Sequence, residues 1–104
     1  MESINIERAQ REEARWRILA GLYIGRPLPL TETILYRLLH DVTLPITPKA
    51  LRTELDYLRE RKLVALEDED TRVWSAKLTR HGTDFVEYTI PAEPGIARPP
   101  EWRD

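Results

Sequence analysis

The feature that most constrains this chain is a helix start at Thr47 that leads directly into two short apolar segments. Thr47 is a residue type that caps helix N-termini, and Pro48 suits the first helical position, where no backbone N–H donor is needed. Leucines then recur at i, i+4 and i+7, as Leu51, Leu55 and Leu58. This spacing predicts an amphipathic helix with its leucine face in the core.

The two apolar segments after this helix predict a β-hairpin. Residues 63–66 are apolar and bounded by charge, and residues 73–78 alternate, with Trp74, Ala76 and Leu78 on one side. The six residues between them, 67–72, carry four acids and one base. Because this turn would repel phosphate, we expect it to stay away from nucleic acid.

Composition limits the chain to one domain and excludes several kinds of site. A length of 104 residues with 41% hydrophobic content is enough for one modest core. The net charge of −2 is the opposite of a strongly basic nucleic-acid binder, so any DNA contact must come from a local patch. With no cysteine, two histidines and no calcium-loop spacing in the acidic turn, we expect no metal and no cofactor. No leader or membrane span is evident, so a cytoplasmic location is expected.

The first half of the chain predicts two more helices. Residues 5–23 have apolar positions at helical spacing after a polar start, which is either a solvated face or a dimer arm. Thr31 caps a second helix from Glu32 to His40. Its expected core stripe is Ile34, Leu35, Leu38 and Leu39.

The last part of the chain predicts a helix and then an extended tail. Thr79 caps a helix from Arg80 to about Tyr88, in which Gly82 indicates close approach to the hairpin. We therefore divide the chain into a domain, residues 1–90, and a proline-rich tail, residues 91–104. Ile96 and Trp102 are apolar anchors in this tail, so it should dock on its own domain, across a dimer or on another protein.

The order of these elements resembles the winged helix domains of small bacterial and phage regulators. Leu58-Arg59-Glu60-Arg61-Lys62-Leu63-Val64 is similar to the junction of recognition helix and wing, and Leu78-Thr79-Arg80-His81-Gly82 to the junction of wing and last helix. With the tail over residues 90–100, the chain resembles winged helix proteins of Mu-like prophages. The resemblance implies a mainly helical α+β fold: a three-helix core, a two-stranded β-hairpin wing and a C-terminal helix. At Lys62 the family commonly has glycine with positive φ, so a strained or different helix end is expected here.

The resemblance implies that the third helix lies in the major groove of double-stranded DNA. The candidate DNA-binding residues lie on its outward face: Lys49, Arg52, Thr53, Asp56 and Arg59. Residues 47–62 hold five bases and three acids, a surplus of only two. A monomer would therefore bind weakly, and we expect a homodimeric transcriptional regulator.

The alternative is a non-enzymatic adaptor in a phage assembly or packaging complex, which would use the first helix, the acidic wing and the tail. Its candidate partner-binding residues are Tyr57, Ile96 and Trp102, and the flank with Tyr57 could equally pack on the first helix. We expect no catalysis, because His81 and Asp84 share a helix face but have no nucleophile beside them.

Overall fold

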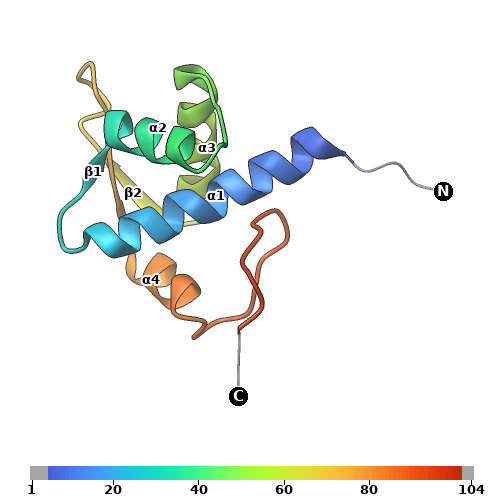
Figure 1. Ribbon diagram of the computed structural model, residues 1–104. Helices are drawn as coiled ribbons and strands as arrows, with labels where there is room; N and C mark the ends of the chain where they lie inside the picture. Colours follow the sequence, from blue (N-terminus) through green and yellow to red (C-terminus); the bar gives the residue numbers. More distant parts are fainter. Residues whose placement is uncertain (1–4, 102–104) are drawn as a thin grey trace.

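The computed structural model of the chain describes residues 5–101 and shows a mainly helical α+β fold (Figure 1). The elements follow one another in this order: α1 (Ile6–Gly25), β1 (Leu30–Thr31), α2 (Glu32–Asp41), α3 (Pro48–Glu60), β2 (Val64–Glu67), β3 (Ser75–Leu78) and α4 (Arg80–Val86). All the predicted helices and the hairpin are therefore present. The short strand β1 was not predicted.

The three strands form one antiparallel sheet in the order β1-β3-β2. Leu66 of β2 and Leu30 of β1 both pair with Ala76, which is fully buried at the centre of the sheet. Beyond β1, the N–H of Glu32 donates to the carbonyl of Trp74 at 2.8 Å. This bond ties the start of α2 to the hairpin.

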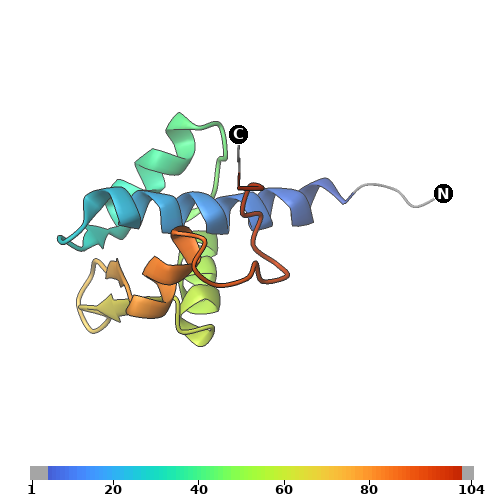
Figure 2. The same cartoon turned by 90° about the horizontal axis from the view of Figure 1, so that it is seen from below.

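Helix α1 is the central element of the fold. Figures 1 and 2 show α2 on one side of it and α4 on the other. Its residues Ile18, Leu19 and Leu22 are at most 1% exposed, and Trp16 lies with its ring centroid 6.4 Å from that of Phe85 in α4. The core therefore lies along the middle and C-terminal part of α1.

The predicted helix starts are confirmed by their capping bonds. The side chains of Thr31, Thr47 and Thr79 each accept a hydrogen bond from the backbone N–H three residues later. Leu51, Leu55 and Leu58 are buried, as the leucine spacing predicted.

The predicted core stripe of α2 was wrong at Ile34, which is 49% exposed. Leu38, one turn further on, packs over Gly21 of α1, where an added Cβ would lie 2.7 Å from the Leu38 Cδ1 atom. The next α1 glycine, Gly25, is instead covered by Leu30. Leu38 and Leu30 thus lie over the α1 glycines, whereas Ile34 lies at the surface.

Several element ends also differ from the prediction: α1 continues to Gly25 rather than ending at residue 23, and β2 spans Val64–Glu67 rather than residues 63–66. Strand β3 starts at Ser75 rather than at Val73, and α4 ends at Val86 rather than near Tyr88, whose φ is 62°. Lys62, at the end of α3, has a φ of 63°. This is the left-handed conformation that glycine adopts at lower cost, so the strained helix end expected at Lys62 is present.

The tail docks back onto its own domain. Ile96 is only 6% exposed, and the N–H of Ala97 donates to the carbonyl of Glu12 in α1 at 3.0 Å. Arg98 Nη1 donates to the carbonyls of Phe85 and Ile90 at 2.9 and 2.8 Å. Ile96 therefore docks on its own domain, the first of the three options given above. Trp102 lies outside the described residues.

Gly82 gives a direct test of how closely α4 approaches the hairpin. A Cβ added there would lie 2.0 Å from the carbonyl oxygen of Leu63, which is backbone and cannot rotate away. We expect Gly82→Ala to lower the free energy of unfolding by about 3 kcal/mol, despite the better helix propensity of alanine. Gly25→Ala is the control, because its Cβ would meet only the Leu30 side chain at 3.0 Å. Equal urea midpoints for both variants would contradict the close approach.

Candidate functional site on the third helix

The five side chains predicted to form a DNA-binding face lie along the outward side of α3. Lys49 and Thr53 are exposed, and Arg52, Asp56 and Arg59 are half-buried. The Thr53 hydroxyl donates to the carbonyl of Lys49 at 3.2 Å, so it is partly used within the helix. The helical period explains why they share a side, but not what each one contacts.

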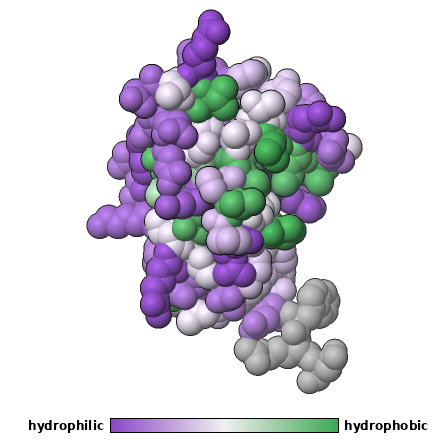
Figure 3. All heavy atoms as spheres, turned by 90° about the vertical axis from the view of Figure 1, so that its left-hand side faces the viewer, coloured by the Kyte–Doolittle hydropathy of each residue, from purple (hydrophilic) through white to green (hydrophobic). Residues whose placement is uncertain are grey.

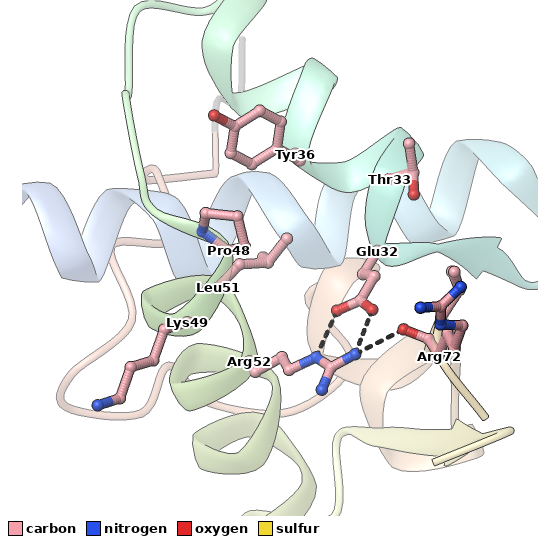
Figure 4. A pocket seen from close by; sticks show the side chains of 9 residues that line it. Glu32, Thr33, Tyr36, Pro48, Lys49, Leu51, Arg52 and Arg72 are labelled. Carbon is pink, nitrogen blue, oxygen red and sulfur yellow. Dashed lines mark hydrogen bonds and ion pairs between the residues drawn. The ribbon is translucent and has the colours of Figure 1, made fainter. Parts of the chain in front are cut away.

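Arg52 is held by an ion pair with the first turn of α2. Its Nε and Nη2 donate to the two carboxylate oxygens of Glu32 at 2.8 and 2.6 Å, and Nη2 also donates to the carbonyl of Arg72 at 2.9 Å (Figure 4). The guanidinium carbon lies 4.5 Å from the ring centroid of Trp74. In the described part of the chain, Nη1 has no protein acceptor, so it alone remains for a ligand.

Glu32 is the anchor of this cluster. Its side chain is only 13% exposed and also accepts a hydrogen bond from the N–H of Trp74 at 3.1 Å. The hydrogen bonds from Arg52 lower the pKa of Glu32, and the Trp74 N–H adds to this against the opposing effect of burial. The same contact raises the pKa of Arg52. The pair therefore stays charged at neutral pH.

Arg59 connects α3 to the acidic turn between β2 and β3. Its Nη1 donates to Glu69 at 2.6 Å, and its Nη2 donates to Asp56. The hydrogen bond from Arg59 to Glu69 is the main reason that the pKa of Arg59 is raised. The acidic turn, which we expected to repel phosphate, thus lies against the basic face and neutralises one of its charges.

A groove opens between α2, the start of α3 and the hairpin, with a volume of about 650 Å³. Figure 4 shows its lining from both helices and from the hairpin. Its lining residues are Glu32, Thr33, Tyr36, Pro48, Lys49, Leu51, Arg52, Arg72 and Val73. The candidate DNA-binding face therefore borders a hollow with an apolar wall, which the sequence did not predict.

A buried ion pair behind this face was also missed. Glu54 of α3 is 3% exposed, and Arg15 of α1 donates to it at 2.7 Å. Arg15 Nη1 also donates to the carbonyl of Gly95 at 2.8 Å, so the pair fastens the tail. Glu54 lies three residues after Leu51 and four before Leu58, and this position on the leucine face was the available signal.

Tyr57, a candidate partner-binding residue, is occupied within the chain. Its ring lies between two guanidinium groups, with the Arg15 carbon 3.6 Å and the Arg61 carbon 3.9 Å from the ring centroid. A Cβ at Gly95 would lie 2.1 Å from the Tyr57 hydroxyl. Of the two options considered for this flank, Tyr57 packs against α1 and the tail.

Residues 5–101 contain no group of three or more histidine, cysteine, aspartate or glutamate side chains that could hold a metal ion. Within the same range, no helix is both long and apolar enough to cross a membrane. His81 lies 3.8 Å from Glu93 of the tail, measured from Nε2 to the carboxylate oxygen. His81 is therefore a contact between α4 and the tail.

The lowered pKa of Glu32 predicts a specific acid dependence of stability. The charged pair contributes fully above the ordinary glutamate pKa of 4.5, and the contribution is lost as the pH falls through the lowered pKa. We expect Glu32→Gln to cost about 1 kcal/mol at neutral pH, with the difference from wild type shrinking as the pH falls below 4.5.

Urea unfolding at a series of pH values measures this difference. Glu67→Gln is the matched control, because Glu67 pairs with Lys77 on an exposed surface at 2.9 Å, where a pair contributes little. A difference between wild type and Glu32→Gln that does not change with pH would contradict the assignment.

No protein-family model, no curated protein and no solved structure matches this chain. A function for the outward face of α3 therefore has to follow from the side chains on it and around it.

Proposed function

We propose that the protein is a winged helix regulator that binds double-stranded DNA as a homodimer and catalyses no reaction. The observation that carries this proposal is the outward polar face of α3, which lies between α2 and the β2–β3 hairpin. In a winged helix, α3 would be the recognition helix and the hairpin the wing. The left-handed Lys62 at the junction of α3 and β2 supports the same comparison.

The start of α3 is the part best placed to reach DNA. Lys49 is exposed and has no acidic partner in the described part of the chain, and Arg52 retains Nη1. Because N-terminal residues of a recognition helix contact the base edges, these two side chains and Thr53 would read or position the DNA. Glu32 would then act by holding Arg52 in one orientation.

The acids on and beside this face set the strength of binding. The three cations of this face are matched in number by three acids: Glu32 binds Arg52, and Glu69 and Asp56 bind Arg59. Phosphates must therefore displace two carboxylates to reach Arg59. This exchange makes binding by one protomer weak. Each phosphate that a cation neutralises contributes about −0.9 to the slope of the logarithm of the DNA-binding constant against the logarithm of the salt concentration. Three cations in each protomer, or six in a dimer, therefore give a slope of about −5.

Fluorescence anisotropy with duplexes selected from a random library tests the proposal. We expect Lys49→Ala and Arg52→Ala each to weaken binding about tenfold, and Glu69→Gln to strengthen it about threefold by releasing Arg59. Lys49 is exposed and outside the core, so its substitution leaves the fold unchanged. Arg80→Ala is the control, because α4 lies across α1 from α2 (Figure 1). Equal weakening by Arg80→Ala and Lys49→Ala, or no binding at about 50 mM salt by wild type and Glu69→Gln, would overturn the proposal.

A protein-interaction adaptor, as in a phage assembly or packaging complex, is the second candidate. Exposed apolar side chains favour it: Ile24 is 83% exposed, Leu28 70% and Ile34 49%. Figure 3, which views the end of the molecule with the α1–β1 turn and the hairpin, shows hydrophobic side chains among polar ones. Apolar groups gathered at a surface are typical of protein contacts.

Leu28→Ser and Ile24→Ser test this second candidate. Under the adaptor proposal, the double variant should lose co-purification with the phage proteins while keeping its urea midpoint, because both side chains are exposed. Glu7→Ser and Arg11→Ser form the control, since both residues are exposed and polar. Unchanged co-purification of the Leu28 and Ile24 variant would exclude this surface.

A further inference from the structure

The groove between α2, α3 and the hairpin has features that contact with a DNA backbone does not require. Its wall includes Pro48, Leu51 and Val73, whose side chains are apolar, and Tyr36, whose ring is apolar apart from its hydroxyl. Its volume of about 650 Å³ lies within the range of small-molecule sites, about 300–1,000 Å³. The hollow is therefore of a size and character to take a compact apolar group.

The charged groups at the groove are mostly basic. Three cations line it, Lys49, Arg52 and Arg72, against the single carboxylate of Glu32. Glu32 is already bound by Arg52 and by the N–H of Trp74, and the other two cations have no acidic partner in the described part of the chain. The groove thus has a surplus of two positive charges beside an apolar wall.

We infer that this groove binds a small organic anion with one apolar, preferably aromatic, body and one carboxylate. The body lies against Tyr36, Leu51 and Val73, and the carboxylate faces Arg72 and the free Nη1 of Arg52. In Figure 4, Arg72 and Arg52 lie together beside Glu32, whereas the Lys49 side chain extends away from them. The two arginines are therefore the main anion contacts, and Lys49 contributes only long-range attraction.

Occupation of the groove has a consequence for DNA, which rests on the proposed function. Arg52 and Lys49 belong both to the groove and to the face proposed for DNA. A carboxylate on Nη1 of Arg52 removes the one donor of that guanidinium left for DNA and adds negative charge to the face. The anion and DNA would thus compete, and the anion would act as an inducer that releases DNA.

A titration monitored by NMR with 2-naphthoate tests the binding site. We expect saturable shifts at Thr33, Leu51 and Val73, and at least tenfold weaker binding of 2-naphthamide, which has the same body without the charge. Arg72→Ala should weaken 2-naphthoate about tenfold, and Val73→Glu should abolish its binding. Val73 is 41% exposed, so this substitution leaves the core intact. Arg80→Ala, which removes an arginine remote from the groove, should change nothing.

Three results would overturn the inference. The first is the absence of saturable shifts in the groove. The second is saturable shifts confined to the separate hollow lined by Leu44, Pro45 and Ile46. The third is equal binding of 2-naphthoate and 2-naphthamide, which would show that the positive charges take no part.

The same samples separate this inference from the proposed function. Binding of 2-naphthoate by a protein that binds no DNA would support the groove and remove the regulator. DNA binding without binding of 2-naphthoate would do the reverse. If both bind, 2-naphthoate should weaken DNA binding in wild type and leave it unchanged in Val73→Glu.

Discussion

Burial of one apolar stripe on α1 holds the parts of this protein together. Ile18, Leu19 and Leu22 are almost completely buried, and α1 contacts α2, α3, α4 and β3. Each such side chain contributes about 1.5–3 kcal/mol on removal from water. Strands of two and four residues would not form a stable sheet alone, so the sheet depends on this helix.

The buried ion pair between Arg15 and Glu54 fixes how α1, α3 and the tail lie relative to one another more than it adds to stability. Two buried charges lose most of the Coulomb energy that they gain to desolvation, although removing one partner is costly. Arg15, however, also binds the Gly95 carbonyl and stacks on Tyr57. One side chain thereby fixes the register of α1 against α3 and the place where the tail crosses them.

The outward face of α3 is organised by ion pairs with its neighbours. Glu32 of α2 holds Arg52, and Glu69 of the hairpin turn holds Arg59. These contacts align the three elements that a winged helix would present to DNA, but they also consume the charges that DNA would need. Lys49, Arg72 and Nη1 of Arg52 remain available in the described part of the chain, and all of them border the groove. The cations that remain for DNA are therefore the same ones that would attract a small anion to the groove.

The sequence by itself determined the four helices, the hairpin and most of the core. Threonine caps, leucine spacing and strand alternation are local signals, because they depend on the helical and strand periods alone. Ile34 shows the limit of such signals: the α2 pattern predicted it in the core, but it is 49% exposed, whereas Leu38 and Leu30 lie over the two glycines of α1.

Only the tertiary structure decided which charged residues of different elements pair with one another. Arg52 and Glu32, Arg59 and Glu69, and Arg15 and Glu54 come from different elements, so no local spacing could pair them. The docking of the tail through Ile96 also depends on contacts between different elements, and so does the groove beside α3. The physical reason is that a period fixes which face a side chain occupies, whereas its partner depends on how those faces meet when the core packs.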